Sequence, residues 1–392
     1  MLDERRPANR VFGAERPGKT PTHYRGPQLK ATAPHFSTPG PDARYASVMA
    51  FDPNAAATES SNIFGLPDSR EDASIVLIPC PYDATSSYGV GSANAPEAIR
   101  EASSQVDLFD RRFGAIYERG LFMEPHPPEV REWSRQARVL AEPIIEQGGS
   151  RAGDEDAVSQ VDGLSRRAAS FVYDRAIAAM DEGKVPGLIG GEHGVAFGLY
   201  KAIAHRHPGV GILQIDAHMD LRPAFEGFAW SHASVMHNVV YDLDGVSRII
   251  QVGIRDYCEQ EANLAESLAP DKAPDGETQI LTYFWDDLAD ERVGGGSWGV
   301  ACERMINLLP SEIIISVDID GLDPTLCPHT GTPVPGGLNW DQLSLLLKMI
   351  KESERTVVGF DLVEVCPSKV PGSSPIDASI GARVLYRLCG CV

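Results

Sequence analysis

The chain has 392 residues, of which 43% are hydrophobic, so it can bury a sizeable core in one large domain or two smaller ones. Its 55 acidic and 35 basic residues give a formal charge of −20, which argues against nucleic acid or an anionic membrane surface as a partner and favours small cations. No apolar run approaches the ~20 residues of a membrane-spanning helix, and the N-terminus lacks an apolar signal segment, so we expect a cytoplasmic protein.

The seven cysteines are odd in number and form no Cys-x-x-Cys pair, which argues against a disulfide framework or a structural zinc site. We expect most of them to be buried thiols. Cys389 and Cys391, near the C-terminus, are the two for which a reactive role stays open.

The first 70 residues are rich in proline, alanine, serine and charge and show no sustained apolar period. Such a composition cannot bury a core of its own. We therefore expect residues 1–70 to form an irregular N-terminal arm that is either disordered or laid across a neighbouring subunit, and residues 71–392 to form the catalytic domain.

From residue 74 onward, short β-branched runs alternate with amphipathic stretches. The runs are apolar throughout, as expected of strands covered on both faces, whereas the stretches have apolar residues three and four apart, as in helices. This alternation predicts a three-layer α/β/α domain with a mostly parallel central sheet, interrupted at 121–160 by an excursion containing a helix or two. The predicted strands are 74–79, 184–191, 209–216, 248–254, 279–284, 312–320 and 356–365, and the clearest helices are 163–183 and 339–353.

Acids and histidines follow four of the predicted strands. Because ligands bind beyond the carboxyl ends of parallel strands, these side chains should meet at one rim of the sheet. Residues two apart in an extended segment point the same way, so each cluster can face a single point. The clusters are Glu192-His193, Asp216-Ala-His218-Met-Asp220, Asp318-Ile-Asp320 and Asp361 with Glu364.

Four aspartates gathered at this rim would repel one another unless cations compensate them. Two divalent cations balance the charge of Asp216, Asp220, Asp318 and Asp320, with His193 and His218 as further ligands. Oxygen and imidazole donors without a thiolate favour manganese or nickel, leave cobalt, iron or zinc open, and disfavour magnesium. Any one of these motifs by itself is also explained by a helix cap or a solvated turn. Their joint occurrence after successive strands favours the metal site.

These residues resemble those of the ureohydrolase family, which includes arginase and agmatinase. The resemblance covers residues 72–392 and is carried by GGEHG (190–194), QIDAHMDLR (214–222), SHASVMHNV (231–239), SVDIDGLDP (316–324), GFDLVEVCP (359–367) and the stretch 81–100. It implies an α/β fold that holds two manganese or nickel ions and hydrolyses guanidino compounds to urea and an amine. The metal ligands implied are His193, Asp216, His218, Asp220, Asp318 and Asp320.

The resemblance also implies that His232 is the catalytic histidine, that Glu364 binds the guanidinium group, and that the protein is a homo-oligomer such as a hexamer. Two stretches depart from the family pattern. Glu192 stands where the family often has Asp, and Ala-Ser-Val-Met follows His232 where agmatinases usually have Gly and then Thr. With its long N-terminal extension, the chain looks most like the nickel-dependent guanidine hydrolases.

The chemistry assigns a task to each group. Two divalent ions lower the pKa of bound water toward ~7, and a carboxylate such as Glu364 matches the fork of a guanidinium. His232 is the expected proton shuttle for the leaving amine, with His237 as the competing candidate. Glu364 could instead pair with a nearby Arg or Lys, and His329, in a loop expected to overhang the rim, is left without an assigned role.

Substrate choice should lie in the loops around the rim. We expect Thr85 and Tyr88 to close the pocket and Trp230 to wall it. These loops carry little positive charge apart from Arg222, so an anionic substrate is disfavoured and free guanidine is preferred. The alternative is an agmatinase or guanidinobutyrase acting on an alkylguanidine. A metallophosphoesterase would need further histidines after residue 330, and a binding protein that had lost its metals would lack ligands.

Overall fold

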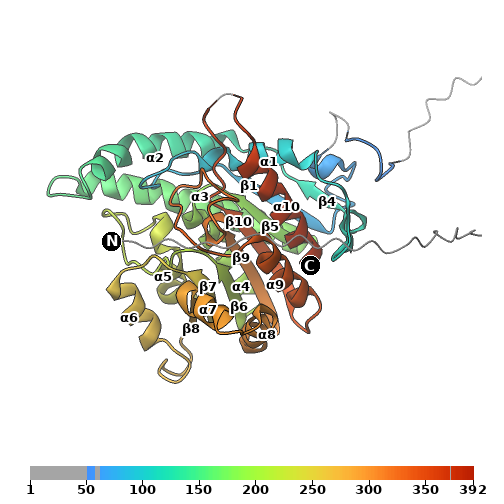
Figure 1. Cartoon of the computed structure of the whole chain (residues 1–392). Coiled ribbons are helices and arrows are strands. Elements are labelled where there is room, and N and C mark those ends of the chain that lie inside the picture. Colours follow the sequence, from blue (N-terminus) through green and yellow to red (C-terminus); the bar gives the residue numbers. More distant parts are fainter. Residues whose placement is uncertain (1–50, 58–61, 371) are drawn as a thin grey trace, which may run out of the picture. The chain divides into compact units, whose positions relative to one another are not determined.

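The computed structural model describes residues 51–57, 62–370 and 372–392. Most of the predicted arm therefore lies outside the described residues. Residues 51–392 form one compact unit built around an eight-stranded sheet in which every hydrogen-bonded pair of strands is parallel (Figure 1). The strand order is β4-β1-β5-β10-β9-β6-β7-β8. The strands are β1 Ile75–Cys80, β4 Leu121–Met123, β5 Val185–Gly190, β6 Val210–Ile215, β7 Val246–Ile254, β8 Gln279–Phe284, β9 Glu312–Asp318 and β10 Thr356–Val363.

The strands are apolar throughout because both faces of the sheet are covered by helices. In β9, Ile313 and Ile315 belong to one hydrophobic core and Ile314, between them, belongs to the other. All three side chains are fully buried. This alternation confirms the predicted three-layer α/β/α arrangement, in which each strand supplies side chains to two cores.

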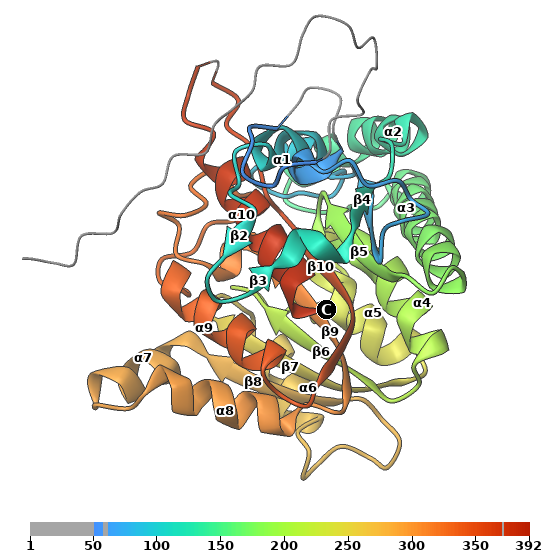
Figure 2. The same cartoon turned by 90° about the vertical axis from the view of Figure 1, so that its right-hand side faces the viewer.

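Two sets of helices cover the sheet. Figure 2 shows α3 and α4 on one side of the strands and α9 and α10 on the other. The helix α2 packs on α3, while α8 and α1 pack against α9 and α10 respectively. The helices are α1 Ala95–Ser103, α2 Pro128–Glu146, α3 Glu155–Asp181, α4 Phe197–Arg206, α5 Val235–Asp242, α6 Glu259–Ser267, α7 Trp285–Val293, α8 Trp298–Leu308, α9 Trp340–Lys351 and α10 Ile376–Cys391. None of the described helices is long and apolar enough to span a membrane.

The excursion at 121–160 contains the helices that were predicted there and one strand that the sequence pattern did not resolve. It begins with the three-residue edge strand β4, which is too short to show a period. It continues with α2 and the start of α3, which begins at Glu155 although the predicted helix began at residue 163. A two-stranded ribbon of β2 (Phe109–Asp110) and β3 (Gly114–Ala115) was also not predicted.

Part of the predicted arm packs on the domain. Ile63, Phe64 and Leu66 are buried in the core beside α1. A little further on, Arg70 forms an ion pair with the buried Glu124, which Arg175 of α3 also contacts at 2.7 Å. Residues 62–70 are therefore integral to the compact unit.

Both C-terminal cysteines are buried in α10, and burial raises the pKa of each thiol. A thiol that resists ionisation is a poor nucleophile, so these residues pack as small apolar side chains.

Candidate functional site

The four central strands β5, β10, β9 and β6 lie side by side and end at the same rim. His193 begins the short helix η4 (His193–Ala196) directly after β5, and Asp216 follows β6. Asp318 is the last residue of β9, and Asp320 lies in η6 (Ile319–Gly321) immediately after it. Each strand thus delivers its acids or imidazole to one place, as the chain pattern predicted.

His193 is the centre of the first donor cluster. Its Nδ1 lies 3.1 Å from Asp216 Oδ2, 3.0 Å from Asp220 Oδ2 and 3.4 Å from Asp318 Oδ2. All four residues are buried, with His193 only 1% exposed. The donor atoms of His193, Asp216 and Asp220 are therefore close enough together to hold one metal ion, and an oxygen of Asp318 lies beside them.

His218 forms the second cluster on the other side of Asp216. Its Nδ1 lies 3.2 Å from Asp320 Oδ2 and 3.7 Å from Asp216 Oδ1. Asp216 has one oxygen in each cluster, so its carboxylate would be shared by the two donor sets if both held a cation. The six predicted ligands are thus brought together as two adjoining donor sets.

The environment of His193 fits a metal ligand. Its Nε2 lies 3.0 Å from Ser316 Oγ, which receives a hydrogen bond from the Tyr200 hydroxyl and donates one to Asp361 Oδ1. With the proton of the ring on Nε2, Nδ1 presents its lone pair to the carboxylates. That buried Nδ1 has no hydrogen-bond partner among the described residues, as expected of an atom reserved for a cation.

The charges of the cluster require compensation. Burial, followed by the charge of Asp216, raises the pKa of Asp220 to about 7. Although burial disfavours its ionised form, Asp216 has its pKa lowered by contacts with both histidines. The pKa of each histidine is raised well above its usual range, although burial opposes this. For His218 the cause is the charge of Asp320 and Asp216. For His193 it is Tyr200 together with the three aspartates. Without cations, protons supply the positive charge that the aspartates need.

Two acids of the site have a left-handed backbone. Asp220 has φ 54° and Glu364 has φ 58°, a conformation that costs a residue with a side chain about 1–3 kcal/mol. The Asp220 carbonyl accepts the N–H groups of Met236 and His237 at the start of α5, and Glu364 N–H donates to Gly191 O at 2.9 Å. These contacts hold both turns in place and aim the carboxylates at the rim.

Glu364 is a buried carboxylate beside the donor clusters. Its Oε1 accepts the backbone N–H of His193 at 2.9 Å, and burial raises its pKa to about 8. Within the described residues, no Lys or Arg forms an ion pair with it. The alternative that it pairs with a basic side chain of the chain therefore has no support among the described residues, and a cationic ligand at this place would favour its ionised form.

His232 begins η5 (His232–Ser234), whose start packs against Gly194 next to His193. Burial, followed by the charge of His218, lowers the pKa of His232 to about 3, so the ring is neutral. Its Nδ1 lies 3.2 Å from Thr85 Oγ1, and its ring packs edge-on against Phe225. His237, the competing candidate, lies on α5 with its ring 4.6 Å from that of Tyr241.

The residues expected to shape the substrate pocket lie in different surroundings. Thr85 is buried and hydrogen-bonded to Glu192 and His232. Tyr88 is 84% exposed. Trp230 packs edge-on against Phe197, with the Arg166 guanidinium 5.6 Å from its ring.

Two loops meet beside Glu364. Gly89 N–H donates to Gly331 O at 3.0 Å, and a Cβ at Gly89 would lie 2.8 Å from the Gly331 backbone. Thr330 Oγ1 donates to the Glu364 carbonyl, and a Cβ at Gly331 would lie 3.8 Å from Glu364 Oε2. The 81–91 and 322–338 loops are therefore in backbone contact next to the carboxylate.

Two further residues hold the 322–338 loop. The Arg255 guanidinium donates to the carbonyls of Asp320, Leu322 and Val334, an anchoring role that sequence reasoning missed because these acceptors are all backbone atoms. His329 Nδ1 lies 2.7 Å from the buried Asp377 at the start of α10. His329, which had no assigned role, thus ties this loop to α10.

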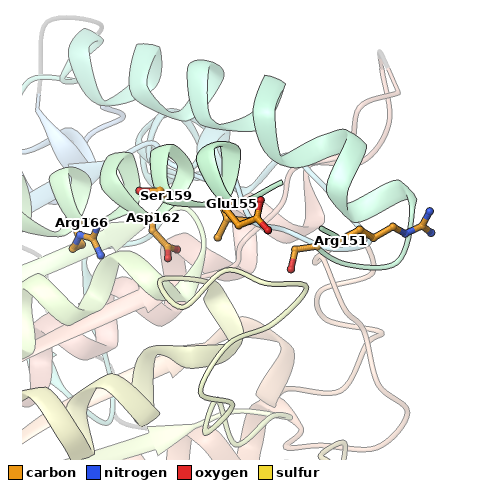
Figure 3. Close-up of a pocket in the computed structure, with 7 residues that line it drawn as sticks. Arg151, Glu155, Ser159, Asp162 and Arg166 are labelled. Carbon is orange, nitrogen blue, oxygen red and sulfur yellow. The ribbon is translucent and has the colours of Figure 1, made fainter. Parts of the chain in front are cut away.

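A separate cavity of about 530 Å³ lies along α3 (Figure 3), with Arg151 and Arg166 near its two ends. None of the predicted site residues lines it. Asp162, which lines this cavity, accepts the backbone N–H of Trp230 at 3.0 Å. This hydrogen bond fixes the segment that precedes His232 to α3.

Carboxylates and imidazoles gather where the central strands of the parallel sheet end. This arrangement is typical of α/β enzymes, which bind their ligands at that rim of the sheet. Comparison with known proteins makes this specific, because the Arginase family matches residues 73–390, and the chain belongs to this family. It is an amidinohydrolase, an enzyme that hydrolyses guanidino carbon–nitrogen bonds.

Individual relatives agree with this membership. The chain is 31% identical over 324 residues to N(1)-aminopropylagmatine ureohydrolase of Synechocystis sp., covering 82% of this chain and 90% of the relative. It is similar in fold to agmatine ureohydrolase of Thermoplasma volcanium (TM-score 0.60, 24% identity, 84% and 94% of the two chains). It is also similar to Trypanosoma cruzi formiminoglutamase with Mn²⁺ (TM-score 0.60, 16% identity, 82% and 94%). At these identities the structural likenesses show the fold alone.

Proposed function

We propose that this enzyme hydrolyses free guanidine to urea and ammonia with the help of two divalent metal ions, Ni²⁺ or Mn²⁺. The observation that carries the proposal is Glu364, a buried carboxylate that lacks a basic partner among the described residues and lies beside two sets of metal donors. A planar cation that donates parallel N–H groups satisfies such a carboxylate.

His193, Asp216, Asp220 and Asp318 would hold one ion, and His218, Asp216 and Asp320 the other. When bound, two such ions lower the pKa of water and so supply a nucleophile near neutral pH. The donor set has oxygen and nitrogen atoms only, which suits manganese and nickel equally.

The side chains of the protein perform the remaining tasks. Glu364 would orient the guanidinium by accepting two N–H groups, which fixes the carbon in place for attack. His232 is neutral and would take up a proton and pass it to the departing nitrogen, which leaves as ammonia. Glu364 is buried and His232 is partly buried, which limits the access of bulk water and strengthens their electrostatic interactions.

The contact between Gly89 and Gly331 supports a small substrate. Because the two loops touch beside Glu364, the space next to that carboxylate is narrow on this side. Free guanidine lacks a side chain and needs no room beyond the guanidinium plane. The exposed position of Tyr88 gives no support to a role in closing the pocket, whereas the buried Thr85 hydroxyl is committed to protein groups.

The second candidate is an alkylguanidine such as agmatine or 4-guanidinobutyrate. It is favoured by the relatives named for aminopropylagmatine and agmatine. A urea-release assay on guanidine, agmatine and 4-guanidinobutyrate, after separate reconstitution with Ni²⁺ and Mn²⁺, decides between the candidates. We expect the highest kcat/KM with guanidine, and a higher value with either alkylguanidine would overturn this choice.

We further propose that the enzyme is a cytoplasmic homo-oligomer, with a hexamer as the expected assembly. Light scattering on the full chain of 42.4 kDa tests the assembly state. A mass equal to one chain would contradict it.

A further inference from the structure

Thr85 lies between a buried acid and the candidate proton shuttle. It is 1% exposed and sits in the 81–91 loop after β1. Its Oγ1 is 3.0 Å from Glu192 Oε1, 3.1 Å from the backbone nitrogen of His232 and 3.2 Å from His232 Nδ1. The three contacts join residues that are more than one hundred positions apart in the chain.

The direction of each hydrogen bond follows from what the groups can offer. A hydroxyl has one proton to donate and two lone pairs to accept. The His232 backbone N–H can only donate, so it occupies one lone pair. The hydroxyl donates to Glu192 Oε1 at 3.0 Å, which leaves it no proton to offer His232. The remaining lone pair of Thr85 then accepts a hydrogen bond from His232 Nδ1–H.

We propose that Glu192 and Thr85 are positioning residues that hold neutral His232 as its Nδ1–H tautomer. This leaves Nε2 as the nitrogen that takes up and releases protons. The inference rests on the role of His232 as proton shuttle in the proposed function, but it does not depend on which guanidino compound is the substrate.

The surroundings of Glu192 support an acceptor role. Both of its oxygens contact Thr85, with Oε2 accepting the backbone N–H at 2.8 Å and Oε1 the hydroxyl. A buried carboxylate is costly unless such donors satisfy it. Within the described residues it has no Lys or Arg partner, so Thr85 is its main compensation. The opposite order of donors, with the hydroxyl proton directed at His232 Nδ1, would place the ring proton on Nε2. The two arrangements are experimentally distinct.

Neutron diffraction from crystals of the metal-loaded enzyme reads the tautomer directly. We expect deuterium on His232 Nδ1 and on Thr85 Oγ1 directed at Glu192. Deuterium on Nε2 with a bare Nδ1 would overturn the proposal. This readout needs no turnover, so failure to hydrolyse guanidine leaves it unaffected.

Glu192→Gln tests the same point with an isosteric change. The amide oxygen must face the Thr85 backbone N–H, so the amide NH₂ faces the hydroxyl and makes it an acceptor from that side. The hydroxyl proton then points to His232 Nδ1 and forces the proton of the ring onto Nε2. On whichever guanidino substrate the wild type hydrolyses, we expect kcat to fall about 10- to 100-fold with KM changed little. Metal content and Tm should match the wild type.

Thr85→Val and Thr85→Ser form a matched pair. Valine keeps the shape and removes the hydroxyl, whereas serine keeps the hydroxyl, so we expect kcat to fall in the first and to be largely restored in the second. Wild-type kcat in both Thr85→Val and Glu192→Gln would overturn the proposal. If either variant loses metal or stability, the neutron measurement on the wild type decides.

Discussion

His193 shows how a single side chain is prepared for its task by its neighbours. Ser316 lies within hydrogen-bond distance of Nε2, and oxygens of three carboxylates lie within 3.4 Å of Nδ1, the nitrogen that would bind a metal ion. Fixing the unused nitrogen of a ligating imidazole sets its tautomer and orientation. Ser316 and Tyr200 were not predicted as part of the site. Asp361 was predicted to lie at the rim with Glu364, but it lies within β10 and accepts a hydrogen bond from Ser316.

Replacing His193 by alanine should remove one of the two metal sites. The first donor set loses its only nitrogen, while His218, Asp320 and Asp216 remain for the second. We expect elemental analysis to find about half the wild-type metal content, with urea release falling by at least ~100-fold because activated water is lost. His205→Ala is the control, since His205 contacts only Tyr173 at the surface among its described hydrogen bonds. Full metal content in His193→Ala would contradict the ligand assignment.

Glu364→Gln tests recognition of the guanidinium group. The amide oxygen can still accept the His193 N–H, so the fold should hold, but the charge and one acceptor are lost. Charge-assisted hydrogen bonds contribute about 1.5–3 kcal/mol, so kcat/KM should fall roughly 10- to 100-fold, chiefly through KM. Steady-state kinetics on the metal-loaded variant measures this, and an unchanged KM would argue against a substrate contact.

At the scale of elements, the site depends on loops that follow adjacent strands and are tied together by backbone contacts. Arg255 anchors the 322–338 loop through carbonyl groups, and Gly89 N–H joins that loop to the 81–91 loop. Both links use backbone atoms of the loops, and the second also requires glycine at position 89, where a Cβ would lie 2.8 Å from Gly331. Their spacing beside Glu364 is therefore a property of packing.

Gly89→Ala should separate these loops. Its Cβ would lie 2.8 Å from Gly331 Cα and O, which are backbone atoms that cannot rotate away. We expect the space beside Glu364 to widen, so that the ratio of kcat/KM for agmatine to that for guanidine rises severalfold. Gly163→Ala, in α3 with nothing within 4 Å of the added carbon, is the matched control and should leave this ratio unchanged. An unchanged ratio in Gly89→Ala would show that the contact does not limit substrate size.

At the scale of the whole molecule, the metal-free domain contains several buried carboxyl groups that resist ionisation. Burial raises the pKa of Glu364 to about 8, of Asp220 to about 7 and of Asp361 to about 6. A carboxyl whose pKa is higher in the folded than in the unfolded state binds more protons when folded. Its contribution to stability is present at a pH below the pKa in the unfolded state, which is about 4, and is lost as the pH rises through the pKa in the folded state.

Chelated protein should therefore become less stable between pH 6 and pH 8.5. The raised pKa of His193 acts in the same direction, because that proton is also held more tightly in the fold. We expect the Tm of the chelated protein to fall by roughly 3 °C or more over this range, since 1 kcal/mol shifts the Tm of a large domain by about 2–4 °C. The Mn²⁺- or Ni²⁺-loaded protein should show a smaller fall. Differential scanning calorimetry of both forms checks this, and a chelated protein that gains stability with rising pH would refute it.

The sequence by itself determined the layers of the fold and the chemistry of the rim. Continuous apolar runs such as 313–315 require cover on both faces, so the parallel sheet and its flanking helices follow from local pattern alone. The rule that parallel strands end at one rim then brought His193, Asp216 and Asp318 together without coordinates. Short elements such as β4 were missed because three residues show no period.

Only the tertiary structure decided which neighbours each group has. The contact of Thr85 with Glu192 and His232 joins three separate segments, and Tyr88 in the same loop points into solvent. Such contacts depend on loop paths and side-chain rotamers, which are set by packing across the whole domain and leave no periodic signal in the chain. The residue types at the rim were therefore readable from the sequence, whereas the partners that orient them required the folded domain.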